Sequence, residues 1–308
     1  MSDQREHVKG RDVIPALADI YNKLYLAPGM DGLKEEYEAV ALGGEEPRVK
    51  SLSHFSGDDE DEMIFEQTPA GEVLAVTLSK REDFEMFLNI MLNKCVIKEI
   101  PKTQGASILD GVVNWNKIHD HMDRFVRAEK EKGVTEPDYD AEFSRFTSDK
   151  KNFKDALIIL SRGPYSAIKA EEAGFSEEEW LELSHTIRRY HECTHFICRR
   201  LYPEKIDAIW DELTADAVGI YAALGRYDIS LAETFLGIKE GKYTGGRLEN
   251  YIKDGEDIQK LSRRVHKVLL EFEEVLSGMQ DKAPFEVAIF LEEKYDGLSD
   301  ILKEGESI

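Results

Sequence analysis

Residues 176–224 read SEEEWLELSHTIRRYHECTHFICRRLYPEKIDAIWDELTADAVGIYAAL and carry the clearest structural pattern in this chain. Ser176 stands three residues before Glu179, which is the spacing of an N-terminal capping box. Phe175 and Trp180 stand at the spacing of a hydrophobic staple. Both features mark the start of a helix. The sequence therefore predicts that a long helix begins directly after the serine.

Two helices are expected in this stretch. The first covers residues 177–201, because Pro203 cannot continue a helix. The second covers roughly residues 204–224 and ends near Gly225, since glycine is common just after the last turn of a helix. Three further helices are expected, over residues 229–238, 246–277 and 284–303. Residues 166–308 are therefore predicted to be mostly helical.

The first helix contains the sequence H-E-x-x-H, formed by His191, Glu192 and His195. Two histidines four residues apart on a helix are separated by about 40° around its axis, so both imidazoles can reach one metal ion. Glu192 projects about 100° from His191 and can flank the metal, where a bound water would sit. Zinc prefers such nitrogen ligands, and a catalytic zinc site needs three protein ligands and an open position.

The third ligand is expected on the second helix. Glu212 and Asp216 lie four residues apart on one face of it, with Ala215 and Gly219 beside them. These small residues would let the helix approach the first one closely enough for the Glu212 carboxylate to reach the metal. Asp216 could then accept the spare N–H of a ligand histidine, the usual arrangement around metal-bound imidazoles.

This pair of helices resembles the core of the gluzincins, the zinc peptidases in which H-E-x-x-H is followed by a glutamate ligand. The segment Glu212-x-x-Ala215-Asp216-x-x-Gly219 is similar to the glutamate helix of thermolysin-like enzymes. The resemblance covers roughly residues 176–224. It implies a zincin-like two-helix metal core and a zinc-dependent hydrolase, more specifically a metallopeptidase that acts on a peptide or protein substrate.

The resemblance also implies a mechanism. Zinc would lower the pKa of its bound water and polarise the substrate carbonyl, while Glu192 would take the proton of the water and hand it to the leaving amine. Thermolysin-like enzymes add a tyrosine or histidine that stabilises the oxyanion. We expect Tyr202 or His266 in this catalytic role. The remaining candidates are Tyr221, Tyr243 and Tyr251.

The N-terminal part, residues 1–165, is expected to form a mixed α+β structure with a small sheet. Helices are predicted over residues 11–27, 79–93 and 108–132, a loop over 43–62, a β-hairpin over 63–68 and 72–78, and strands over 96–100 and 156–160. We expect residues 156–160 to be an edge strand that binds the substrate backbone by strand addition. A strand in the body of the sheet is the alternative.

The composition limits which partners the protein can bind and in which compartment it is expected. The chain has 308 residues with 62 acidic and 40 basic side chains, a formal charge of −22 that disfavours nucleic acid and anionic membrane surfaces. No stretch approaches the roughly 18 apolar residues of a membrane span. The sequence shows no disulfide framework, because its cysteines number only three: Cys95, Cys193 and Cys198. Cys193 and Cys198 are expected to be packing residues. A cytoplasmic protein is expected.

Two other classes of protein are alternatives to the hydrolase. A zincin-like protein that binds metal without turnover, as a sensor or scaffold, would not need Glu192. A carboxylate-bridged di-iron protein would use two E-x-x-H half-sites, here Glu182 with His185 and Glu192 with His195. Those half-sites must come from different helices. On one helix, ten residues separate them by about 15 Å, so the di-iron interpretation fails on geometry.

Overall fold

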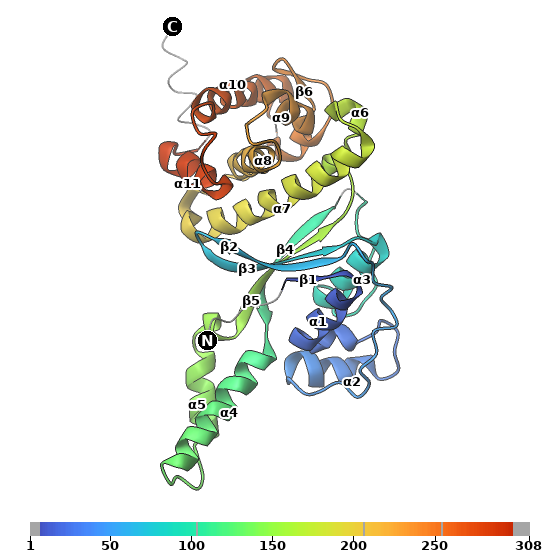
Figure 1. Cartoon of the computed structure of the whole chain (residues 1–308), viewed down its shortest axis with the longest axis vertical. Coiled ribbons are helices and arrows are strands. Elements are labelled where there is room, and N and C mark those ends of the chain that lie inside the picture. Colours follow the sequence, from blue (N-terminus) through green and yellow to red (C-terminus); the bar gives the residue numbers. More distant parts are fainter. Residues whose placement is uncertain (1–6, 103, 206, 254, 298–308) are drawn as a thin grey trace. The chain divides into compact units, whose positions relative to one another are not determined.

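The computed structural model describes residues 7–297 apart from residues 103, 206 and 254. The protein is α+β, with a five-stranded mixed sheet in its N-terminal half and helices in its C-terminal half, as the sequence predicts. The chain forms two compact units (Figure 1). The first runs up to Phe65 and includes Val73–Pro101 and Ile108–Ser161; the second holds Glu66–Glu72, Lys102–Ser107 and the chain from Arg162 onward.

The first unit carries the sheet and its helices, apart from the ends of β2, β3 and β4 that fall in residues 66–72 and 106–107; η marks a short 3₁₀ or π segment. Its elements are β1 (Val8–Lys9), η1 (Gly10–Asp12), α1 (Val13–Ile20), η2 (Asn22–Tyr25), α2 (Leu33–Tyr37), η3 (Glu38–Leu42), β2 (Glu62–Thr68), β3 (Gly71–Leu78), α3 (Arg81–Met91), β4 (Ala106–Val113), α4 (Trp115–Glu131), α5 (Tyr139–Thr147), η4 (Lys150–Asn152) and β5 (Lys154–Ser161).

The strand order of the sheet is β1-β2-β3-β5-β4. Strand β1 pairs antiparallel with β2, and β3 pairs parallel with β5, with Leu74 opposite Leu157. Side chains of α1 and α3 join those of β3 and β5 in one apolar core, in which Leu17, Phe84 and Ile159 are fully buried. Burial of these large side chains is the main contribution to the stability of this unit.

Strand β5 is central in the sheet, which corrects the expectation of an edge strand over residues 156–160. It lies between β3 and β4, so its backbone is paired on both sides. Its five apolar residues are buried without the alternation that a strand with one exposed face shows. The strand at this edge of the sheet is β4.

Two other predicted elements of the first unit are wrong. Residues 108–113 form the second part of β4 and are not helical; the helix α4 begins only after Asn114, whose side chain accepts a hydrogen bond from the backbone N–H of Lys117. Residues 96–100 form no strand, because the side chain of Asn89 bonds both the N–H and the C=O of Lys98. A backbone held by an amide side chain is not free to join the sheet.

The second unit is mostly helical. Its elements are η5 (Tyr165–Ala167), α6 (Ala170–Ala173), α7 (Glu177–Leu201), η6 (Pro203–Lys205), α8 (Ala208–Leu224), α9 (Ile229–Leu236), β6 (Ile238–Lys239), β7 (Lys242–Tyr243), η7 (Arg247–Tyr251), α10 (Ile258–Leu276) and α11 (Pro284–Lys294). The helix predicted over 246–277 is shorter, because η7 occupies residues 247–251 and α10 begins only at Ile258. Residues 298–303 of the last predicted helix lie outside the described residues.

Helix α7 has the predicted bounds. The Ser176 hydroxyl accepts a hydrogen bond from the N–H of Glu179, and the rings of Phe175 and Trp180 stack with centroids 5.9 Å apart. The predicted start of α8 is four residues too early, because the side chain of Asp207 caps the helix.

Helices α7 and α8 lie side by side along much of their length (Figure 1). Their backbones approach closely at Gly219, where a Cβ atom would lie 2.7 Å from the carbonyl oxygen of Ile187. Only glycine fits at that separation. The close approach brings the side chains of the two helices together one to two turns away, where the candidate site lies.

Candidate metal centre

Helix α7 presents two histidines to the same point. His191 and His195 are one turn apart, both are buried, and their Nε2 atoms lie 2.9 Å from each other. Neutral imidazoles can direct two nitrogen lone pairs to one cation at such a separation. Glu192, the next residue after His191, is half-buried and lines the cleft beside them.

Helix α8 supplies the third donor. The carboxylate oxygens of Glu212 lie 3.7 Å from Nε2 of His191 and 3.5 Å from Nε2 of His195. One ligand atom from each of the three side chains lies within 4.8 Å of the other two. This group can hold a metal ion, and it unites the three residues expected from the sequence.

Each of the two histidines turns its second ring nitrogen to an aspartate on α8. Nδ1 of His191 lies 2.9 Å from Oδ1 of Asp216, and Nδ1 of His195 lies 2.8 Å from Oδ2 of Asp211. An Nδ1–H held by a carboxylate leaves Nε2 free to bind a metal. The sequence reasoning found Asp216 but missed Asp211. The His195 imidazole needs an acceptor for its second ring nitrogen. Asp211, the residue before Glu212, can supply one, and this need could have indicated it from the sequence.

Tyr165 and Arg247 extend the polar network behind His191. The Tyr165 hydroxyl donates to Oδ1 of Asp216 at 2.7 Å and lies 2.8 Å from Nδ1 of His191. Arg247 forms an ion pair with the other oxygen of Asp216, and its Nη1 donates to the Tyr165 hydroxyl at 3.2 Å. These residues come from η5 and η7. No spacing relative to H-E-x-x-H indicates them, because the tertiary fold alone brings them to the site.

The electrostatics of the group favour a bound cation. Burial raises the pKa of Glu212, but His195, His191 and Arg247 outweigh burial and lower it well below its ordinary value. Burial alone would lower the pKa of His195, whereas the carboxylates of Asp211 and Glu212 raise it to about 10. Negative charge therefore surrounds the imidazoles, and a divalent cation could replace the proton that they hold.

An open cleft of about 640 Å³ leads to the group. It is lined by residues 104–106, by Tyr165 and Ser166, by α7 and α8 around the histidines and glutamates, and by residues 246, 247 and 249–251. Tyr251 and Glu212 both line the cleft. Burial raises the pKa of the Tyr251 hydroxyl; Arg247 opposes that rise and the Glu212 charge adds to it. The phenol is therefore neutral at physiological pH.

The two residues expected to stabilise an oxyanion lie elsewhere. Neither Tyr202 nor His266 is among the described residues that line the cleft. Tyr202 ends α7, two turns beyond His195, with the ammonium of Lys205 over its ring. His266 lies on α10, with Nδ1 2.7 Å from a carboxylate oxygen of Glu233. Of the tyrosines weighed from the sequence, Tyr251 is the one that lines the cleft.

The cysteines near the motif are not among the candidate ligands. Cys193 and Cys198 are buried and free, and neither belongs to the group that could hold a metal. Burial raises the pKa of both thiols. They are therefore neutral packing residues of α7 at ordinary pH.

The fold and the site define a two-unit α+β protein with a candidate metal centre in its helical unit. The chain belongs to a family of unknown function (DUF7005), whose family model matches residues 13–287. This match includes every residue of the metal centre. No curated protein and no solved structure gives a significant match. Within the described part of the chain, none of the helices combines the length and apolar character needed to span a membrane.

Proposed function

We propose that this protein is a zinc-dependent hydrolase of the gluzincin type, a metallopeptidase that cleaves peptide bonds. The observation that carries the proposal is the convergence of His191, His195 and Glu212, with Glu192 in the same cleft. A site that only stores metal has no need of a further carboxylate there. The proposal also draws on the resemblance of the H-E-x-x-H and Glu212 helices to gluzincins.

The donor distances suit zinc. With bonds of about 2.0–2.1 Å, two ligands of a tetrahedral zinc ion lie about 3.3 Å apart. The separations of 2.9, 3.5 and 3.7 Å among the two Nε2 atoms and the Glu212 oxygens bracket that value. Two nitrogens and one oxygen are also a ligand set of catalytic zinc sites, which keep one position open.

Each residue of the site then has a separate role in the proposed reaction. A zinc ion held there would supply Lewis-acid polarisation of the substrate carbonyl and a water of lowered pKa. Glu192 would serve as the general base that accepts a proton from the attacking water and as the acid that protonates the leaving amine. Tyr251, neutral and in the cleft, donates a hydrogen bond to the carbonyl oxygen as negative charge develops on it. Asp211 and Asp216 hold the imidazoles in the required orientation.

The substrate backbone is proposed to bind along residues 104–106. These residues line the cleft and lead into β4, the last strand in the sheet order. An extended peptide can bind along such a segment through its backbone N–H and C=O groups. The sequence predicts this role for β5, but β5 is paired on both sides. We therefore assign binding of the substrate backbone to residues 104–106, where β4 begins.

The decisive variant is Glu192→Gln. It keeps the shape of the side chain and removes the base, so zinc content should remain near one ion per chain. Hydrolysis of peptides that the wild type cleaves should fall by about 10²–10⁴-fold, the usual contribution of a general base. Both forms are incubated with a mixed peptide library, and the products are read by mass spectrometry.

Glu249→Gln is the matched control. Glu249 is another carboxylate of the same cleft, and it accepts a hydrogen bond from the Tyr243 hydroxyl. This variant should keep most of the activity. Equal cleavage by wild type and Glu192→Gln would remove the assigned base. A zinc-loaded wild type that cleaves nothing in a broad library would favour a zincin-like protein that binds metal without turnover.

We also propose a cytoplasmic location. All three cysteines are free and buried. Unpaired thiols are the rule where glutathione and thioredoxin keep them reduced.

A further inference from the structure

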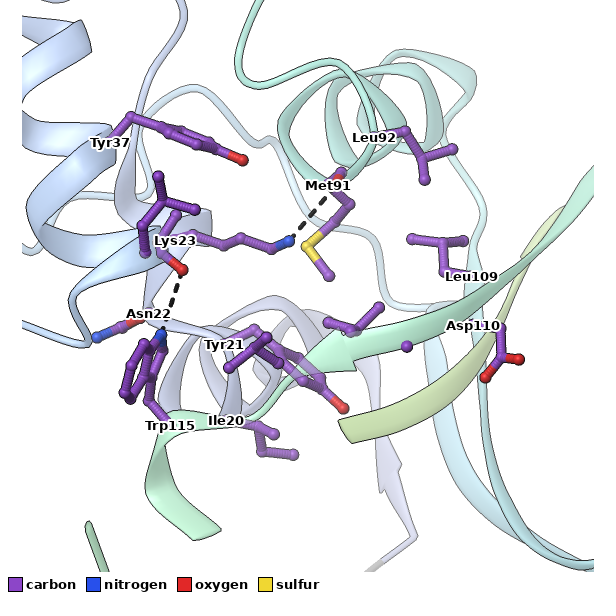
Figure 2. A pocket seen from close by; sticks show the side chains of 15 residues that line it. Ile20, Tyr21, Asn22, Lys23, Tyr37, Met91, Leu92, Leu109, Asp110 and Trp115 are labelled. Atoms are coloured by element: carbon purple, nitrogen blue, oxygen red, sulfur yellow. Dashed lines mark hydrogen bonds between the residues drawn. The ribbon is translucent and has the colours of Figure 1, made fainter. Parts of the chain in front are cut away.

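A second cavity lies in the first unit, apart from the metal centre. It has a volume of about 230 Å³ and lies against the last residues of α1, against η2, η3 and the end of α3, and along strand β4 (Figure 2). Pockets for drug-sized ligands measure about 300–1,000 Å³, so this one suits a smaller molecule. Nothing in the proposed hydrolase mechanism uses it.

Lys23 extends across this cavity and is the feature that needs an explanation. Its ammonium makes one long hydrogen bond, 3.4 Å to the backbone oxygen of Met91. Among the residues that the structure describes, no carboxylate lies within ion-pairing distance of it. Burial lowers the pKa of this ammonium, with the Cys95 thiol as a smaller opposing influence. A half-buried cation without a carboxylate partner is costly, even though acidic side chains are plentiful in this chain.

The walls around Lys23 combine apolar side chains with a few polar groups. Met91 and Leu109 line the cavity, and Tyr37 points its hydroxyl toward the space beside the Lys23 ammonium (Figure 2). Asp110 is the one acidic residue that the described lining includes. It occupies an outward position of β4, and Figure 2 shows its carboxylate turned away from the lysine. The Tyr21 hydroxyl already donates to Asp155, so the cavity offers a ligand the Lys23 ammonium, the Tyr37 phenol and apolar surface.

Large apolar side chains also surround the opening. Leu42 and Leu92 line the cavity and are 64% and 52% exposed. Exposed apolar residues that cluster at a cavity are typical of a site that receives an apolar group. A ligand that fits must therefore combine an apolar body with a single negative charge.

We propose that this cavity binds a small monocarboxylate, whose carboxylate pairs with Lys23 and the Tyr37 hydroxyl while its aliphatic or aromatic body fills the apolar walls. A carboxylate matches one ammonium and one hydroxyl in charge and in number of acceptors. A phosphate group carries more charge and more acceptors than this cavity can satisfy. The size of the cavity points to a body of about ten heavy atoms.

The test uses the full-length protein and 3-phenylpropionate as the probe. Isothermal titration calorimetry compares it with 3-phenylpropanamide, which has the same shape without the charge. The wild type should bind the acid at least tenfold more tightly than the amide, because the charged pair forms only with the acid. Equal binding of the acid and the amide, or no binding of the acid at millimolar concentration, would overturn the proposal. Inorganic phosphate that competes as well as the acid would do so too.

Lys23→Met removes the charge and keeps the length of the side chain. It should abolish the preference for the acid. Lys34→Met is the matched control, because Lys34 is an exposed lysine on α2 of the same unit and does not line the cavity. It should bind both compounds like the wild type. Undiminished binding of the acid by Lys23→Met would show that the carboxylate sits elsewhere.

A second measurement on the wild type keeps the test valid if Lys23→Met does not fold. Reductive methylation followed by peptide mapping reports the reactivity of each lysine. Bound 3-phenylpropionate should slow methylation of Lys23 at least severalfold and leave Lys34 unchanged. If the acid leaves the methylation of Lys23 unaltered, the assignment of this cavity is wrong. Neither measurement depends on zinc or on hydrolysis, so this proposal stands or falls separately from the metal centre.

Discussion

The aspartates behind the two histidines decide how well the site can hold a metal. Asp216 and Asp211 each face the Nδ1 atom of one ligand imidazole. Replacing either by Asn keeps the size but removes the negative charge that faces Nδ1 of the ring. Zinc affinity should fall about 10–100-fold in each variant, as is usual for partners of metal-bound histidines. Competition with a chromogenic chelator measures the affinity.

Asp281→Asn is the control for this pair, because Asp281 is an exposed aspartate in a turn of the same unit. Its zinc affinity should equal that of the wild type. If Asp211→Asn and Asp216→Asn also match the wild type, the aspartates do not support the ligands and the proposed coordination through Nε2 needs revision.

Proton competition gives the site a predictable pH dependence. Burial would lower the pKa of His195, but Asp211 and Glu212 raise it to about 10 in the metal-free protein, above the value of about 6.5 for an unfolded chain. Protonated His195 therefore stabilises the metal-free fold fully below about pH 6.5, and this contribution is lost as the pH rises toward 10. Zinc must displace that proton, so the rise in melting temperature on adding zinc should grow between pH 6.5 and 8.5. A rise that stays constant or shrinks would contradict the assigned proton.

At the residue scale, the sequence predicts what local spacing encodes. His191, Glu192 and His195 follow from helical periodicity, and Glu212 with Asp216 follows from the same period on the next helix. Tyr165, Arg247 and Tyr251 lie in η5 and η7, where no periodic pattern exists. Their places depend on how the short segments fold over α7 and α8. This is why Tyr251 and not Tyr202 lines the cleft.

At the scale of elements, the contact of α7 with α8 is the feature on which the site depends. Gly219→Val would place a branched side chain where even a Cβ atom lies 2.7 Å from the backbone oxygen of Ile187. The helices must move apart, which should cost about 1–3 kcal/mol of stability and separate Glu212 from the histidines. Zinc content and urea denaturation measure both effects.

Ala222→Val is the control on the same helix. Ala222 is half-buried on α8 and already carries a Cβ atom, so the substitution introduces the same branched side chain at a position where a Cβ atom is accommodated. It should lower stability only slightly and leave zinc content unchanged. Full zinc content in Gly219→Val would show that the close approach of the helices is not what positions Glu212.

The sequence predicts best those elements whose ends are marked by capping or turn residues. The capped and stapled start of α7 gives its bounds, and the Pro-Ala-Gly turn gives the hairpin of β2 and β3. Residues 108–113 were misread because a short apolar run fits a helix or a strand equally well. The pairing of β4 with β5 makes this run a strand, and that contact is remote in sequence.

At the scale of the whole molecule, the two units have separate apolar cores. One core centres on α1, α3 and the sheet, and the other on α7 to α11. The metal group and its cleft belong wholly to the second unit, and the Lys23 cavity wholly to the first. A bound ligand stabilises the part of a protein that must open before the ligand can dissociate. Each site should therefore stabilise its own unit.

Hydrogen exchange can test this separation. Removing zinc with a chelator should speed amide exchange in α7, α8 and η7, because these three elements supply the ligands and the network behind them. Exchange in α1 and α3 should change little, since their amides become accessible to solvent only when the apolar core of the first unit opens. Deuterium uptake read by mass spectrometry of peptic peptides gives both measurements in one experiment. A uniform increase across α1, α3, α7 and α8 would mean that the two cores open together and that zinc stabilises the whole chain as one cooperative unit.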